Sequence, residues 1–196
     1  LSDLVSAVKQ AAADGAALPQ AHEEVEPSFE HTPADAIPEL VEQGAAVRVL
    51  VGEAFGARSP VKTHSQTVYL DIALPAGGRF ELPPLAPELA VYAVDADLAV
   101  NGEPVAVHTM AVLPNGQGGV LTADAAVRLV VIGGEPLDGP RYITWNFVSS
   151  RRERILEAGA DWAAQRMGHV PGETEFIPLP GKPFGVREPD TGTTPV

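Results

Sequence analysis

The sequence predicts an all-β fold, a double-sheet barrel or jelly roll, with a helix and an arm before it and an amphipathic helix after it. Three observations lead to this prediction. Between Val47 and Phe147 the chain has about nine short segments with period-two hydrophobicity, separated by Gly and Pro. Asn101-Gly102, between two such segments, is the strongest short hairpin signal. After Val148 the hydrophobic period becomes helical.

The chain before the strands divides into a helix and an arm. Residues 1–17 place apolar side chains on one helical face, Ser2 can cap their start and Gly15 can end them, so we expect a short helix there. Residues 18–45 are rich in proline and acidic side chains and show no sustained period. Such a segment is either a solvated linker or an extended arm, and we favour the arm.

The predicted β region covers residues 46–148. Its segments alternate apolar and polar side chains over short stretches, as strands with one buried face do. Apart from the two that flank Asn101-Gly102, they are Val47–Gly52, Thr67–Leu74, Gly78–Pro83, Glu88–Val94, His108–Leu113, Gly119–Ala123 and Val127–Gly134. Tyr142–Phe147 alternates in the same way and reads as a last strand, with heavy side chains, that leads into the helix.

The C-terminal part is predicted as a helix over residues 149–168 and an extended tail over residues 169–196. Ser150 and Glu153 have the spacing of a capping box, and Gly168 is a plausible stop signal. The apolar side chains from Ile155 to Trp162 share one face. We therefore expect the helix to cover an apolar surface and Trp162 to be substantially buried.

The composition limits the class of protein. The chain has 196 residues, 45% of them hydrophobic, which suits one globular domain with extensions. Because it contains no cysteine, disulfides, thiolate metal sites and cysteine nucleophiles are excluded. The net charge of −13, from 13 Lys+Arg and 26 Asp+Glu, argues against nucleic-acid binding. There is no membrane-length apolar segment and no signal peptide, so we expect a cytoplasmic protein without membrane contact.

The basic cluster Arg151, Arg152 and Arg154 opens the predicted helix, where positive charge opposes the helix dipole. The interpretation we favour is that these arginines pair with local carboxylates such as Glu153 or Glu157. The alternative is that they form a contact surface for an acidic segment, which could come from the same chain.

Several long motifs carry a resemblance to a known family. They are WNFVSSRRERILEAGADWAAQRMG followed by PGETEFIPLP, GGEPLDGP (Gly133–Pro140), FGARSPVKT (Phe55–Thr63) and LPQAHEEVEPSFEH (Leu18–His31). With these motifs the chain resembles the second half of a bacterial pirin, a two-cupin protein related to quercetin 2,3-dioxygenases. The resemblance implies a cupin fold with the arm packed across it, and a metal-dependent dioxygenation of flavonols in the whole protein. It also implies that iron or another divalent metal is bound by the other half.

The metal ligands of such a cupin have no counterpart in this chain. A metal-binding cupin takes neutral imidazoles and a carboxylate from adjacent strands, commonly as H-x-H with a Glu shortly after and a later His. At the matching place Leu82, Pro83 and Pro84 replace the histidines, and Glu88 alone echoes the carboxylate. No His stands at the later place, around Leu121. We therefore expect no metal ligand and no cofactor in this chain.

A cupin interior can still form a pocket. The candidate lining residues have polar or aromatic side chains in or next to predicted strands, and strand parity without a register does not say which point inward. They are Tyr69, Arg79, Glu88, Tyr92, Arg128 and His64. For His64 we favour a surface or satisfied core position over a ligand-binding one.

Three functional classes follow from these observations. The chain is expected to be the catalytically silent, structural half of a quercetinase-like bicupin. The alternatives are a self-standing, metal-free cupin that binds or transforms a small molecule, and a redox-linked protein-interaction module as the resemblance implies. For partners we expect a second copy of the chain or the missing N-terminal cupin half, because either would cover surfaces that are open here.

Overall fold

The computed structural model describes residues 17–169 and 171–180. The chain divides into two compact units. The first, here called the β unit, is Glu26–Pro136, and the second, here called the helical unit, combines the chain up to Val25 with the chain from Leu137 onwards. The helix expected over residues 1–17 lies outside the described residues except for its last position.

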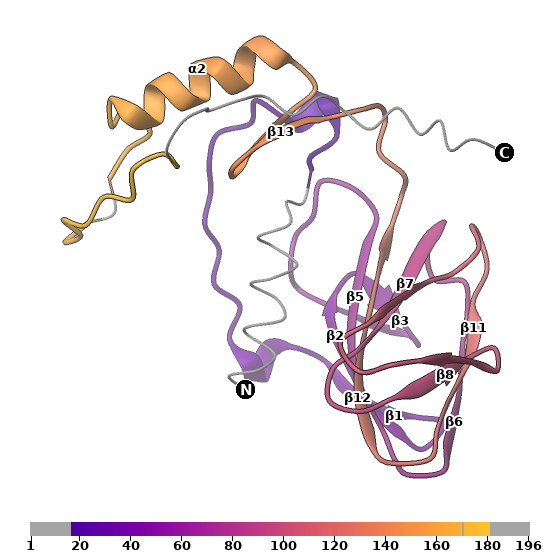
Figure 1. Cartoon of the computed structure of the whole chain (residues 1–196). Coiled ribbons are helices and arrows are strands. Elements are labelled where there is room, and N and C mark those ends of the chain that lie inside the picture. The colour runs from indigo at the N-terminus through magenta and orange to yellow at the C-terminus, as the bar shows by residue number, and fades with distance from the viewer. Residues whose placement is uncertain (1–16, 170, 181–196) are drawn as a thin grey trace, which may run out of the picture. The chain divides into compact units, whose positions relative to one another are not determined.

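The β unit consists of two antiparallel sheets and a small hairpin (Figure 1). The six-stranded sheet has the order β1 (Glu39–Glu42), β2 (Ala45–Val51), β5 (Thr67–Leu74), β12 (Val127–Gly134), β7 (Glu88–Ala93) and β10 (Met110–Val112). The four-stranded sheet has the order β6 (Gly78–Leu82), β11 (Gly119–Ala123), β8 (Leu98–Val100) and β9 (Glu103–Val105). The small hairpin pairs β3 (Glu53–Ala54) with β4 (Ala57–Arg58), and a short 3₁₀ turn, η2 (Ala34–Ala36), precedes β1.

The predicted all-β, cupin-type double-sheet fold is confirmed. Among the described residues the two sheets are separate hydrogen-bonded ladders and do not close into a continuous barrel. The predicted hairpin joins β8 to β9, with Asn101 at φ 53° and Gly102 at φ 85°. Both values are in the left-handed region that Asn and Gly tolerate best, which is why this dipeptide identified the turn.

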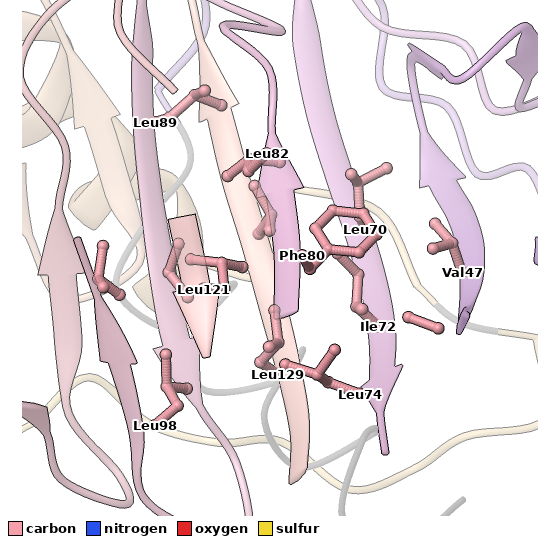
Figure 2. Close-up of a cluster of buried hydrophobic side chains, with 14 of the residues drawn as sticks. Val47, Leu70, Ile72, Leu74, Phe80, Leu82, Leu89, Leu98, Leu121 and Leu129 are labelled. Atoms are coloured by element: carbon pink, nitrogen blue, oxygen red, sulfur yellow. The ribbon is translucent and has the colours of Figure 1, made fainter. Parts of the chain in front are cut away.

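The core of the β unit is made of apolar side chains from the inner faces of both sheets. Along β5, for example, Leu70, Ile72 and Leu74 are almost completely buried, while the residues between them point to the other face. Figure 2 shows the side chains that gather between the strands. Those it labels are Val47, Leu70, Ile72, Leu74, Phe80, Leu82, Leu89, Leu98, Leu121 and Leu129, all of them buried. Phe55 closes the cluster with an edge-to-face contact to Phe80, at 5.6 Å between ring centroids.

Among its described residues, the helical unit contains a short hairpin, one α-helix and one 3₁₀ turn (Figure 1). These elements are η1 (Gln20–His22), β13 (Tyr142–Thr144), β14 (Phe147–Ser149) and α2 (Arg152–Ala163). The single strand predicted over Tyr142–Phe147 is therefore wrong. Trp145 has φ 52° and turns the chain, so that Thr144 pairs with Phe147.

The helix itself is confirmed, but the two end signals were misread. Arg151 is the N-cap residue and has no side-chain cap, so the capping box expected for Ser150 is absent. The helix ends at Ala163, where Gln165 adopts φ 54° and the N–H groups of Gln165 and Arg166 donate to Trp162 and Asp161. This is a Schellman motif with Gln in the usual place of Gly, so Gly168 is not the stop.

The face that α2 buries is narrower than the sequence indicated. Ile155, Ala158 and Gly159 are the buried helix residues. Trp162 is partly covered and does not belong to the fully buried set. Its neighbours are aromatic side chains from the β13–β14 turn and from the tail.

Candidate functional site

The space between the two sheets has no metal donors where a cupin site would need them. Phe80 and Leu82 point inward from β6, and Leu121 of β11 stands opposite Phe80. Glu88 lies at the start of β7 and is exposed. Within the part of the chain that the structure describes, no three or more His, Asp or Glu side chains are grouped to hold a metal ion. At these places the inner faces therefore present apolar side chains.

The six candidate pocket residues are not brought to one interior pocket. Tyr69, Tyr92, Arg128 and Glu88 alternate with core residues and so lie on the outer face of the six-stranded sheet. Arg79 is exposed on β6, where its Nη2 donates to Oε1 of Glu81 over 2.8 Å.

His64, the sixth candidate, lies in the exposed loop between β4 and β5. It borders an open hollow of about 480 Å³ that Ser28, Glu30, Thr32 and Lys62 also line. Lys62 and Glu30 form an ion pair of 3.0 Å across this hollow. This ion pair is too exposed to contribute much stability.

An ion pair stands at the centre of the outer sheet face. Nε and Nη2 of Arg128 donate to the two carboxylate oxygens of Asp71, each over 2.7 Å. The Asp71 side chain is only 7% exposed, and the Arg128 side chain is 29% exposed. Burial, and next the negative charge of Asp71, raise the pKa of the Tyr69 hydroxyl. Tyr69 therefore stays neutral over the physiological range, beside a pair whose charges cancel.

The rest of the outer face is largely apolar. Val130 is 2% exposed and stands opposite Asp71 on one side and Tyr92 on the other. The same rows of the sheet continue into Met110 and Val112 of β10, which are 48% and 76% exposed. The apolar or aromatic members of this surface, here called the outer face, are Val41, Tyr69, Ala90, Tyr92, Met110, Val112, Val130 and Ile132.

A sequence signal for the outer face exists. The segment VRLVVI of β12 is apolar at almost every position, a composition typical of strands that are covered on both faces. Tyr69 and Tyr92 alone did not reveal it, because their direction depends on the register that only the structure gives.

In the helical unit, two of the motifs that carry the resemblance, Leu18–His31 and Gly133–Pro140, meet at Arg141. Its side chain is 3% exposed. Nη2 donates to the carbonyl of Leu18 over 2.8 Å and to Oδ1 of Asp138 over 2.5 Å, and Nη1 donates to the carbonyl of Gly139 over 2.7 Å. Nε lies 2.6 Å from Oε1 of Glu23 but is not aligned for a hydrogen bond, so this contact is an ion pair.

Glu23 links that arginine to the start of α2. Its carboxylate accepts hydrogen bonds from the backbone N–H of Ser150 over 2.9 Å and from the Ser150 hydroxyl over 2.8 Å. Ser149 contributes a further bond of 3.3 Å. Ser150 is thus engaged with Glu23 and is not available to cap the helix. Because Glu23 is only 8% exposed, removal of either charged partner would leave a buried charge unpaired.

Glu24 is the ion-pair partner of Arg151 and Arg154 in the basic cluster. Arg151 forms a short ion pair with Glu24, and Nε of Arg154 lies 3.3 Å from its other oxygen. The favoured interpretation, pairing with Glu153 or Glu157, is therefore wrong for these two arginines. The alternative is right, since their partner comes from the acidic segment of the same chain.

None of the helices among the described residues is long and apolar enough to cross a membrane.

The chain is similar to known proteins in sequence and in structure. A family model described as the pirin C-terminal cupin domain matches residues 69–168. The chain is 41% identical over 167 residues to a pirin-like protein of Caulobacter vibrioides, an alignment that covers 84% of this chain and 57% of that protein. It is 30% identical over 164 residues to the pirin of Rattus norvegicus, covering 80% of this chain and 56% of that one.

Among solved structures, a quercetin 2,3-dioxygenase from Acinetobacter baumannii aligns with a TM-score of 0.77 and 30% identity. The alignment covers 88% of this chain and 58% of that chain. The chain thus spans about half the length of the curated relatives that it matches.

The acidic groups of the helical unit predict how its stability depends on pH. The hydrogen bond from Arg141, and next that from the Gln20 backbone N–H, hold the pKa of Asp138 below its ordinary value. The hydrogen bond from Arg151 lowers the pKa of Glu24, against an opposing effect of burial. A lowered folded-state pKa stabilises the fold above the unfolded-state pKa of about 4, and this stabilisation is lost as the pH falls through the folded-state value.

We therefore expect the Asp138→Asn/Glu24→Gln double variant to lose stability less steeply than the parent below about pH 4. Urea unfolding followed by tryptophan fluorescence measures this, because both tryptophans of the chain lie in the helical unit. Glu157→Gln, an exposed change on α2 of the same unit, is the matched control and should keep the parent's slope. Equal acid slopes for the double variant and the parent would contradict the assignment.

Proposed function

Because the chain belongs to the pirin family, we propose that it is the catalytically silent, structural cupin of a two-cupin protein related to quercetin 2,3-dioxygenases. In this role it supports a metal-binding cupin half and performs no oxidation itself. The two-cupin arrangement is part of the proposal, and the share of the relatives' length that the chain leaves uncovered supports it.

The proposal that this half is catalytically silent rests on the apolar packing between the two sheets. A metal site of this fold needs at least three converging side chains with nitrogen or oxygen donors. The inner faces supply aliphatic side chains and Phe80 to the core cluster of the β unit. A donor introduced there would need a partner, because a buried polar group without a hydrogen bond costs about 1–3 kcal/mol. The interior is thus chemically suited to packing.

The outer face supports the structural role. A monomeric sheet usually turns polar side chains to water, but here the solvent-facing rows contain Val41 and Val112, each 76% exposed. Large exposed apolar patches mark interaction surfaces. The mutual hydrogen bonds of the Asp71–Arg128 pair reduce the cost of burying its charges under a partner.

The partner that we propose for the outer face is the N-terminal cupin half of the family, which this chain does not include. Its contribution would be a second apolar sheet, since two sheets pack face to face at about 10 Å. When that half is absent, we expect the outer face to bind a second copy of the chain, because a symmetric dimer uses the same patch on both subunits.

The first prediction concerns metal and flavonol. After reconstitution with iron, copper, nickel or manganese and removal of excess metal, the chain should retain well under one equivalent, and it should not consume quercetin. Elemental analysis and the loss of flavonol absorbance measure the two quantities. One equivalent of tightly held metal, or quercetin turnover that depends on metal, would show that this half is not silent.

The second prediction concerns the outer face. The chain should bind the separately produced part of the Caulobacter vibrioides pirin-like protein that it does not align with, and Tyr92→Glu should weaken this binding at least about tenfold by placing a charge in the contact. Glu103→Lys, an exposed change on β9 of the other sheet, is the control and should bind like the parent. Isothermal titration calorimetry measures the dissociation constants. Equal affinities of Tyr92→Glu and the parent would show that the outer face is not the binding surface.

A further inference from the structure

A cluster of four aromatic rings lies on one side of the helical unit. Trp162 of α2 meets Trp145 of the β13–β14 turn edge to face, at 5.2 Å between centroids. Phe147 contacts Trp145 in the same manner at 5.6 Å. The fourth ring, Phe176, comes from the tail and stacks on Trp162 at 5.6 Å with an interplanar angle of 28°. Trp145, Phe147 and Trp162 thus form a platform, and the tail supplies its occupant.

The tail is recognised through one ring and one carbonyl group. The Phe176 ring stacks on the Trp162 indole, and Nε1–H of that indole donates to the carbonyl oxygen of Ile177 over 2.8 Å. Pro178 follows Ile177 and restricts it to extended backbone, so the carbonyl is presented without much loss of conformational entropy. Aromatic grooves that bind extended proline-containing segments use the same combination of stacked rings and a backbone hydrogen bond.

The tail is held at few points. Ile177 is 63% exposed and Phe176 is 38% exposed although both sit at the platform. The described part of the tail has no helix or strand, so no backbone ladder adds to the two contacts with Trp162. Between the helix and the tail the backbone turns at Gln165, Gly168 and Gly172, all with positive φ. Segments with exposed side chains and few hydrogen bonds open locally at a small free-energy cost.

Trp145 shows that the platform is built at the expense of backbone strain. Its φ of 52° lies in the left-handed region, which bulky residues rarely adopt and which Asn or Gly would fill without strain. A strained conformation persists where the surroundings over-determine it, and such positions cluster at binding sites. Here the conformation delivers an indole to the edge of Trp162.

We propose that the platform of Trp145, Phe147 and Trp162 is a binding site for an extended peptide segment in which an aromatic residue is followed by a branched aliphatic residue and a proline. The chain's own segment Glu173–Pro180 occupies this site as a releasable strap. The site belongs to the helical unit and is independent of the outer face, so it stands or falls separately from the proposed function.

A free peptide must compete with the strap for the platform. A segment joined to its site by a short linker acts at an effective concentration in the millimolar range. The parent chain should therefore bind an added peptide weakly, whereas Phe176→Ala, which removes the stacked ring of the strap, should bind it at least about tenfold more tightly. Phe29→Ala, at a Phe that is 93% exposed in the β unit, is the matched control and should behave like the parent.

Tryptophan fluorescence reads this site directly, because the chain has 2 tryptophans and both belong to the platform. The probe is the synthetic peptide PGETEFIPLP, the sequence of residues 171–180, titrated into the full-length parent and its variants. A peptide with Ala in place of its Phe is the control ligand. Trp162→Phe keeps an aromatic ring but removes the N–H donor, so combined with Phe176→Ala it should lose most of the gain in affinity.

Two results would support the proposal: saturable binding of the peptide by Phe176→Ala that the Ala-containing peptide does not reproduce, or a dimer of the parent that Phe176→Ala abolishes, which would place the strap of a second copy on the platform. Fluorescence of Phe176→Ala that does not respond to the peptide at millimolar concentration would overturn it. So would equal affinities of parent and Phe176→Ala, because the strap would then not cover the site.

Discussion

The rest of the structure depends on how the space between the two sheets is filled. Leu82 and Leu121 lie where the family resemblance would put metal ligands, and Phe80 and aliphatic neighbours pack around them. Burial of apolar area stabilises the fold at about 25 cal/mol per Å², whereas a donor in this environment would need partners that the inner faces do not supply. This packing stabilises the β unit.

The motifs that identify the family have a structural explanation of the same kind. Leu18, Glu23, Asp138 and Arg141 come from segments far apart in the sequence, and the buried guanidinium group of Arg141 needs each of them. Loss of one partner of a buried charge typically costs about 3–5 kcal/mol, so such residues are fixed together. The motifs that supply Leu18, Glu23 and Asp138 therefore have a structural role in the helical unit.

The sequence predicted the strands well because period-two patterning and the Asn101-Gly102 turn are local signals. It did not predict what depends on distant partners. The direction of Tyr69 and Tyr92 needs a register, the role of Ser150 is decided by Glu23, and the partner of Arg151 is Glu24, each more than a hundred residues away or on another strand. The turn at Trp145 was missed because a bulky residue at positive φ contradicts local propensity.

The measurement that tests the filled interior most directly is a crystal structure of the chain under xenon pressure, since xenon enters dry apolar cavities large enough to hold it. We expect no xenon atom between the two sheets, with Phe80, Leu82 and Leu121 in mutual packing as in Figure 2. Xenon bound among these side chains would show a cavity there. That result would contradict the account, because the interior could then hold a small ligand.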